Sequence, residues 1–133
     1  MRKIFLIVLI TIVSTLLLTA CASNASKKDN APAKAVEDYL NALVAKDANR
    51  LSTLSCGDWE DSALLELDSF QAVNTRLDGL SCEQTGTDGN TALVLCRGKI
   101  IATYNNEDQD LDLSVRTYQV VQQGGEWLVC GVR

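Results

Sequence analysis

The sequence predicts an α+β domain in which N-terminal helices pack on a curved, antiparallel sheet of four strands that two disulfides hold together. Three observations support this fold class. Apolar residues recur every three or four positions from residue 32 to 70, but they alternate with polar residues after position 80. Glycine-containing turns separate the alternating segments. Four cysteines stand between residues 56 and 130, and such an even set is typical of disulfides in an exported chain.

Residues 1 to 20 predict an export signal. Arg2 and Lys3 give the chain a cationic start, and residues 4 to 18 are apolar apart from two threonines and a serine. This run is shorter than the ~20 apolar residues that a membrane-spanning helix needs, and no basic stop-transfer cluster follows it directly. A permanent N-terminal anchor helix is the alternative interpretation.

The end of this segment, Leu18-Thr19-Ala20-Cys21, resembles the lipobox of bacterial lipoproteins. The resemblance implies that residues 1 to 20 are removed and that Cys21 becomes a lipidated N-terminus, with the membrane as its partner. Ala20-Cys21-Ala22 also fits ordinary A-x-A cleavage, which would discard Cys21. In the sorting pattern of lipoproteins, an aspartate after the cysteine favours the inner membrane. Alanine at position 22 therefore implies an extracytoplasmic location at the cell surface or outer membrane.

Residues 21 to 31 are small, polar and charged, and they predict a flexible lipidated tether. Arg2 and Lys3 leave with the signal, so 10 basic residues then face 17 acidic ones and the net charge falls from −5 to −7. An acidic domain argues against a nucleic-acid partner. The absence of histidine removes the commonest metal ligand and the usual acid–base group of neutral pH. We therefore expect no metal and no cofactor.

Residues 32 to 133 predict a single domain that begins with three helices. Pro32 fits the first position of a helix, and one apolar stripe follows it: Val36, Tyr39, Leu40, Leu43 and Val44. Asp47 is expected to cap a second, short helix that ends near Cys56. Asp58 is expected to cap a third, whose apolar face holds Leu64, Leu67 and Phe70.

The strands begin where the period of the apolar residues changes. Leu80 and Cys82 alternate with polar neighbours, and residues 87 to 90 form a turn signal. The run TALVLCRGKIIATY, residues 91 to 104, is long enough for a curved strand, and Gly98 in its middle predicts a bend or bulge.

The second half of the predicted sheet follows a turn at residues 105 to 110. Leu111, Leu113 and Val115 alternate with polar residues as a third strand, and a bulge is expected near Thr117 and Tyr118. A Gln-Gly-Gly turn at residues 123 to 125 then leads into the last strand, residues 126 to 133.

Two segments resemble small exported lipoproteins of the NTF2-like, or cystatin-like, superfamily. In PAKAVEDYLNALVAKDANRL an amphipathic helix with an aromatic residue, Tyr39, is followed by an Ala-Lys-Asp break into a second helix. In GGEWLVC a glycine-rich turn precedes Trp127 in the last strand. The resemblance implies a cone-shaped α+β domain over residues 32 to 133, and it implies no reaction.

The four remaining cysteines, Cys56, Cys82, Cys96 and Cys130, are predicted to form two disulfides. A zinc site is the alternative, but no CxxC pair and no histidine supports it. Cys82 and Cys96 flank the turn at residues 87 to 90 almost symmetrically, which favours a bridge between adjacent strands and leaves Cys56 for Cys130. The pairing of Cys56 with Cys82 and of Cys96 with Cys130 remains open.

NTF2-like enzymes such as ketosteroid isomerase work in the mouth of the cone with a carboxylate base and a tyrosine or aspartate donor. No carboxylate here matches such a position, so we assign no catalytic residue. Tyr39, Tyr104, Tyr118 and Trp127 are the candidates for lining a pocket, although such side chains more often pack in a core. The acidic run at residues 107 to 112 lacks the pattern of a calcium loop and predicts a solvated hairpin tip.

These observations favour a non-catalytic, membrane-anchored domain that binds a small apolar ligand or an envelope protein. The alternatives are an isomerase- or dehydratase-like enzyme at the mouth of the cone and a purely structural accessory domain. A deep pocket that holds a desolvated acid beside a tyrosine hydroxyl would favour the enzyme. A filled cone with an exposed apolar patch would favour protein binding.

Overall fold

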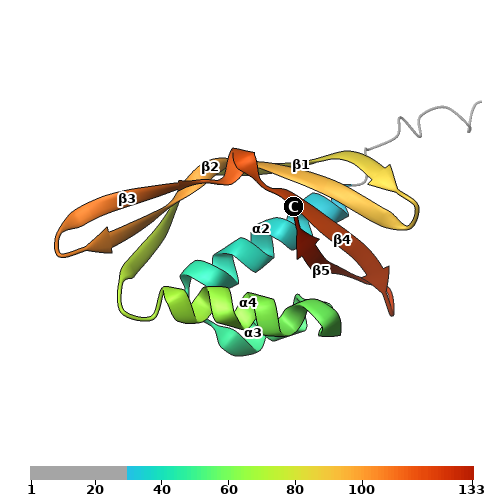
Figure 1. Cartoon of the computed structure of the whole chain (residues 1–133). Helices are drawn as coiled ribbons and strands as arrows, with labels where there is room; N and C mark the ends of the chain where they lie inside the picture. Colours follow the sequence, from blue (N-terminus) through green and yellow to red (C-terminus); the bar gives the residue numbers. More distant parts are fainter. Residues whose placement is uncertain (1–29) are drawn as a thin grey trace, which may run out of the picture.

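The computed structural model describes residues 30 to 133. The predicted signal, the lipidation site Cys21 and the tether up to residue 29 lie outside the described residues. Three helices precede the strands, as Figure 1 shows. In chain order the elements are α2 (Ala31–Val44), α3 (Ala48–Thr53), α4 (Gly57–Ser69), β1 (Asn74–Asp88), β2 (Thr91–Tyr104), β3 (Glu107–Asp112), the 3-10 helix η1 (Leu113–Val115), β4 (Thr117–Gln123) and β5 (Glu126–Val132). Between residues 30 and 133, no helix has the length and apolar content to cross a bilayer.

The first two helices form as the sequence predicts. α2 carries Pro32 in its first turn, and Val36, Tyr39, Leu40 and Leu43 are fully buried along one face. The side chain of Asp47 caps α3, because its carboxylate accepts a hydrogen bond from the backbone N–H of Arg50 at 3.0 Å.

The predicted cap of the third helix is wrong. α4 begins at Gly57 after Cys56, whose side chain makes no capping hydrogen bond, and Asp58 lies inside the first turn. The cause is tertiary: the backbone N–H of Cys56 donates to the carbonyl of Val129 at 2.8 Å, so β5 sets the point where the helix starts. A carboxylate in the first turn still interacts favourably with the helix dipole. The buried face consists of Ala63, Leu67 and the following Phe70, whereas Leu64 is half-buried.

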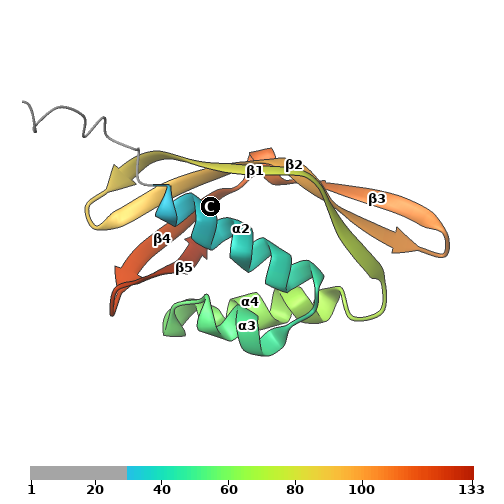
Figure 2. The same cartoon turned by 180° about the vertical axis from the view of Figure 1, so that it is seen from behind.

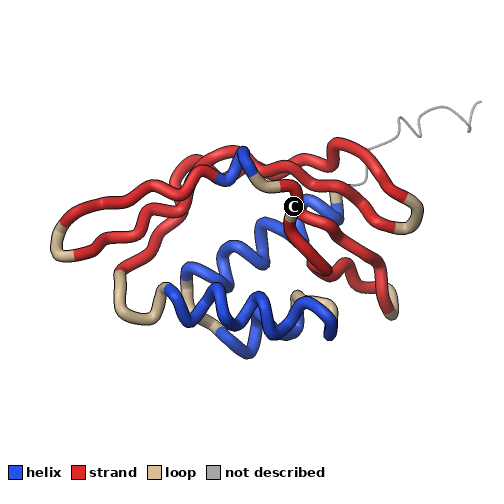
Figure 3. Tube along the Cα trace, in the orientation of Figure 1, coloured by secondary structure: helices blue, strands red, loops and turns tan. Residues whose placement is uncertain are grey.

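The sheet has five antiparallel strands, so the predicted number of four is slightly wrong. One edge of β2 pairs with β1, and its other edge pairs first with β4 and then with β3. β5 pairs with β4 at the end of the sheet. β3 and β4 therefore follow one another along the same edge of β2, and Figure 3 shows the short helix η1 between them.

The predicted third strand is interrupted by η1, so its apolar residues do not share one face. Leu113 is buried, while Val115 is 76% exposed at the end of η1. The turn before it is also shorter than predicted. Asn105 and Asn106 both have positive φ angles, 48° and 67°, as a tight two-residue hairpin requires, and β3 begins at once with Glu107.

The sheet arches over the helices, as the opposite views in Figures 1 and 2 show. The bend lies where β1 and β2 approach each other at Gly79 and Gly98, which have φ angles of +66° and +96°. A β-carbon at position 98 would lie 2.5 Å from the carbonyl oxygen of Asp78, so only glycine fits there. The predicted bend at Gly98 is therefore confirmed. β1 has a bulge at the same place, so both Leu77 and Leu80 face the core although they are three positions apart. The start of this strand therefore shows no regular alternation in the sequence.

The four cysteines lie in two pairs, which correspond to the first pairing considered above. Cys82 and Cys96 are opposite each other in β1 and β2, with 4.0 Å between their Cα atoms. Cys56 and Cys130 join the start of α4 to β5, with a Cα separation of 4.9 Å. The edge of β5 is closed at the same corner by hydrogen bonds to the chain between α3 and α4.

We predict that Gly98→Ala lowers the free energy of unfolding by at least about 2 kcal/mol, because the new methyl group meets the backbone of β1 and the positive φ strains an L-residue. Chemical denaturation of the purified protein measures this loss. Gly86→Ala is the matched control in the same sheet, since a β-carbon there has no neighbour within 4 Å. Equal stabilities of the two variants would contradict a bend that depends on close backbone contact.

Candidate functional site

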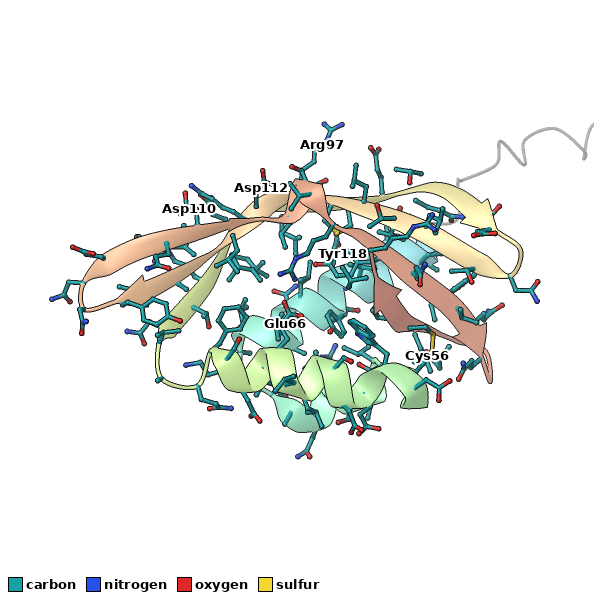
Figure 4. The ribbon with its side chains drawn as sticks, viewed as in Figure 1. Cys56, Glu66, Arg97, Asp110, Asp112 and Tyr118 are labelled. Atoms are coloured by element: carbon teal, nitrogen blue, oxygen red, sulfur yellow. A yellow bond between two sulfur atoms is a disulfide. The ribbon has the colours of Figure 1, made fainter. Side chains whose placement is uncertain are left out.

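A cluster of polar and aromatic side chains lies between the sheet and the helices. It consists of Tyr39 from α2, Trp59 and Glu66 from α4, Arg116 from the link between η1 and β4, and Tyr118 from β4. Tyr118 faces inward because it alternates with Thr117 and Gln119 along β4. Figure 4 shows Glu66 pointing from α4 into the space below the sheet, on the same side of the sheet as Tyr118.

The two tyrosines form the closed interior of this cluster. Both are fully buried, and their rings meet edge to face with centroids 6.4 Å apart. The indole N–H of Trp59 donates a hydrogen bond of 3.3 Å to the Tyr39 hydroxyl oxygen. Among the described residues, the Tyr118 hydroxyl has no hydrogen-bond partner. Burial raises the pKa of Tyr39 above its ordinary value and raises the pKa of Tyr118 to about 12. Neither hydroxyl is therefore prepared to lose its proton near neutral pH.

An ion pair lies at the rim of the cluster. The Arg116 Nη1 atom donates to Glu66 Oε1 at 2.6 Å, and the side chains of Arg116 and Glu66 are 29% and 21% exposed. Burial by itself would lower the pKa of Arg116, but the hydrogen bond and the charge of Glu66 outweigh it and raise that pKa. The carboxylate of Glu66 thus makes a charge-assisted hydrogen bond to Arg116. A general base would need a free carboxylate.

Glu66 and Arg116 were not among the site residues predicted from the sequence. A signal for Glu66 was available, because it follows Ala63 by three positions and precedes Phe70 by four, which places a carboxylate on the apolar side of α4. Arg116 gave no such signal, since its position depends on the interruption of the strand at η1.

The structure brings together only two of the four aromatic candidates. Tyr39 and Tyr118 are in contact, whereas Tyr104 is 42% exposed at the end of β2. Trp127 lines a separate hollow of about 440 Å³ between the ends of the two hairpins, together with side chains that are mostly polar, such as Gln84 and Gln122.

The described part of the chain has two other prominent hollows, and neither of them enters the cluster. One of about 480 Å³ lies on the outer face of the sheet above Gly79 and Gly98, and the other, of about 300 Å³, lies beside Lys46 and Asn106. Tyr39, Tyr118 and Glu66 line none of the three hollows. The space around Tyr39 and Tyr118 is therefore packed with the protein's own side chains.

The acidic run at residues 107 to 112 is the strand β3 rather than a hairpin tip. Its backbone pairs with β2, and two of its carboxylates meet cations on the outer face of the sheet. Asp108 pairs with Arg76 at 2.7 Å, and Asp110 pairs with Lys99 at 2.6 Å. Within residues 30 to 133, no group of three or more potential ligands is arranged to hold a metal ion.

No protein-family model matches the chain. No curated protein matches it either. Solved structures do match. An NTF2-like protein with a cystatin-like fold from Novosphingobium aromaticivorans has a TM-score of 0.54 and 12% identity over 75% of each chain.

Two further structures match at similar levels. A candidate scytalone dehydratase from the same organism has a TM-score of 0.52 and 18% identity, and the alignment covers 77% of this chain and 78% of that one. A candidate calcium/calmodulin-dependent protein kinase II association domain from Xanthomonas campestris has a TM-score of 0.55 and 14% identity, with 85% and 90% covered. At such identities the likeness shows the fold alone: the chain has an NTF2-like, cystatin-like α+β fold.

We predict opposite effects for the removal of the two buried hydroxyls. Tyr118→Phe removes a polar group that has no partner and raises the free energy of unfolding by about 0.5–2 kcal/mol, whereas Tyr39→Phe leaves the Trp59 N–H without its acceptor and lowers it by about 1 kcal/mol. Denaturant titrations of both variants against the wild type measure the difference. A loss of stability in Tyr118→Phe would mean that this hydroxyl has a partner in solution.

Proposed function

We propose that the protein is a lipid-anchored extracytoplasmic domain that binds an envelope protein and does no catalysis. One observation carries the choice between binding and catalysis: the space around the two central tyrosines is filled. Tyr39 and Tyr118 are fully buried in the place that a substrate would need, and Arg116 already occupies the carboxylate beside them.

The chemistry of the cluster also argues against an isomerase- or dehydratase-like activity. Such reactions need a group that gains or loses a proton near neutral pH. Burial raises the pKa of both tyrosines away from that range, and Glu66 is held in an ion pair. One of the similar structures is named as a dehydratase candidate, but a shared fold does not transfer a reaction.

The outer face of the sheet supports protein binding. Leu93, Leu95, Val121 and Leu128 are half-buried, and they alternate with the core residues Ala92, Val94, Val120 and Val129, so they point away from the helices. Strand pairing places Val121 opposite Leu128, and it places Leu93 opposite Gln119, two positions before Val121 on the same face of β4. We call these four residues the outer-face patch. Figures 1 and 2 show the described helices on the opposite, concave side of the sheet.

The charges around the outer-face patch favour a protein over a lipid surface. Asp78 and Asp112 lie on the same outer face, in the half of the sheet next to the patch, and the mature chain has an excess of acidic residues. Anionic headgroups would repel these carboxylates. The patch itself carries no charge, and Glu83 and Arg97, which are 3.7 Å apart, supply both signs at its border. An apolar centre with a mixed polar rim is usual for protein interfaces.

The lipobox-like segment and the paired cysteines support the proposed location. Disulfides persist in oxidising, extracytoplasmic compartments, and both cysteine pairs lie at disulfide distance. A tether after Cys21 would hold the domain close to other envelope proteins, which raises their effective concentration at the outer-face patch.

The proposed lipid anchor and disulfides predict the mass of the mature protein and the number of its free thiols. Protein extracted from membranes should begin at Cys21 and carry the added mass of acyl chains, and its other four cysteines should resist alkylation until they are reduced. Intact-mass spectrometry before and after reduction measures both properties. The Cys21→Ala variant lacks the predicted lipidation site, so it should be absent from the membrane fraction. A chain that still carries Met1, or one with free thiols, would contradict the proposed location.

The binding face predicts a position-dependent crosslink. A photoreactive amino acid in place of Leu93 should give one discrete adduct in intact cells, because this residue lies in the outer-face patch. The matched control is the same amino acid in place of Leu65, which is 72% exposed on α4 at the opposite side of the domain. Adding Leu95→Asp should remove the adduct from position 93. Adducts of equal yield from both positions, or none from position 93, would refute this face as the site of binding.

A further inference from the structure

A hollow of about 440 Å³ opens where the two hairpins at one end of the sheet separate. Thr91 and Val121 form the last pair between β2 and β4, and the hollow lies beyond this pair. Figures 1 and 2 both show the β1–β2 and β4–β5 hairpins ending on the same side of the domain. The lining residues all belong to these two hairpins, and none belongs to a described helix. The hollow is therefore distinct from the packed space between the sheet and the helices.

The lining of this hollow is neutral. No residue that lines it carries a charge, whereas three aspartates and a lysine line the hollow at the bend of the sheet. A charged ligand would lose its hydration here without meeting an opposite charge, so the lining favours a neutral ligand. The volume lies within the range of about 300–1,000 Å³ that is usual for small-molecule sites.

Several hydrogen-bonding side chains in the hollow are free to meet a ligand. Among residues 30 to 133, the side chains of Thr87, Asn90 and Gln122 have no hydrogen-bond partner. Gln84 donates from Nε2 to the carbonyl oxygen of Gly86 at 3.3 Å, and its own side-chain oxygen stays available. Each amide side chain offers two N–H donors and one acceptor oxygen. This combination suits hydroxyl groups, which also donate and accept.

Trp127 supplies the apolar part of the lining. Part of its side chain packs against the core, and it also lines the hollow. Its indole N–H has no partner among the described residues, and it is not buried. A pyranose ring has an apolar face of C–H groups and a rim of hydroxyls. Such a ring can lie against an aromatic side chain while its hydroxyls bond to neighbouring amides.

Both hairpins are held in place before any ligand binds. The Cys82–Cys96 pair joins β1 to β2, and the Cys56–Cys130 pair ties β5 to the start of α4. Gln123, at the end of β4, donates from Nε2 to Cys56 Sγ at 3.4 Å. A preformed site avoids the free-energy cost of ordering loops on binding.

We propose that the hollow between the hairpin ends binds a neutral saccharide. One sugar ring lies against Trp127, and its hydroxyl groups exchange hydrogen bonds with the side chains of Asn90 and Gln122. The hollow shares only Val121 with the outer-face patch, so this site goes beyond the proposed function and does not depend on it. The binding is non-covalent, and no bond is made or broken.

Isothermal titration calorimetry of the full-length protein tests this site. The probes are maltotriose, cellotriose and triacetylchitotriose. The detergent is lauryldimethylamine oxide, because detergents with sugar headgroups would compete for the hollow. We expect at least one of these trisaccharides to bind with a saturable heat. Trigalacturonate, an anionic trisaccharide, should bind about tenfold more weakly, because no cation lines the hollow.

Variants of the lining locate the binding. Trp127→Ala should weaken binding of that trisaccharide at least about tenfold, whereas Trp127→Phe, which keeps an aromatic ring, should weaken it only several-fold. Gln122→Leu should also weaken it several-fold. The matched control is Gln109→Leu, the same change at an exposed glutamine of β3, at the opposite end of the sheet (Figure 1), and it should leave binding unchanged. Thermal melting shows that each variant is folded.

Sedimentation with purified peptidoglycan identifies the source of the saccharide. Sedimentation that the trisaccharide reverses identifies a glycan of the cell wall, and binding of the trisaccharide without sedimentation identifies a free oligosaccharide. The proposal is overturned if no trisaccharide gives a saturable heat or if trigalacturonate binds as tightly as the neutral probes. It is also overturned if Trp127→Ala or Gln122→Leu leaves binding unchanged.

Discussion

The close approach of two backbones at the bend of the sheet determines the shape of this domain. Position 98 of β2 touches the backbone of β1 at Asp78 and Gly79, and a side chain there has no room. Because the strands bend at this point, the sheet arches and its concave side can hold three helices (Figure 1). The same bend directs the hairpin of β2 and β3 away from the core, which leaves β3 exposed apart from the half-buried Leu111. A flat sheet would give neither an enclosed interior nor a separate outer face.

The interior of this arch is closed by covalent, apolar and ionic contacts together. The corner between α3 and α4 is held against β5 by the Cys56–Cys130 pair and by hydrogen bonds to Val129. This attachment holds α4 close to the sheet, and both tyrosines between them are fully buried. The protein's own side chains fill the interior around Tyr39 and Tyr118. Two exposed features lie outside this interior: the outer-face patch and the rim where Glu66 meets Arg116.

These two surfaces differ in chemistry. The outer-face patch is apolar and broad, and it lies on a rigid sheet, so it would bind by burying area. The rim cluster is small and polar, and the Tyr118 hydroxyl in it has no hydrogen-bond partner among residues 30 to 133. An ion pair of this kind stabilises little when it is exposed, and a partly buried pair is weak evidence for stability alone.

Local patterns in the sequence determined the fold class, the helices α2 and α3, the bend at Gly98 and the even set of cysteines after Cys21. Each of these depends on neighbours within a few residues: an apolar stripe, a capping carboxylate, a glycine inside a strand. The tertiary structure alone decided where α4 begins, how β3 and β4 divide one edge of β2, and which acid and which base meet below the sheet. Alternation cannot reveal a strand once a bulge or a 3-10 turn reverses its inward side, as happens at Gly79 and at Leu113. Nor can spacing bring Glu66 to Arg116, because fifty positions of chain separate them and only the packing of α4 against the arched sheet closes that distance.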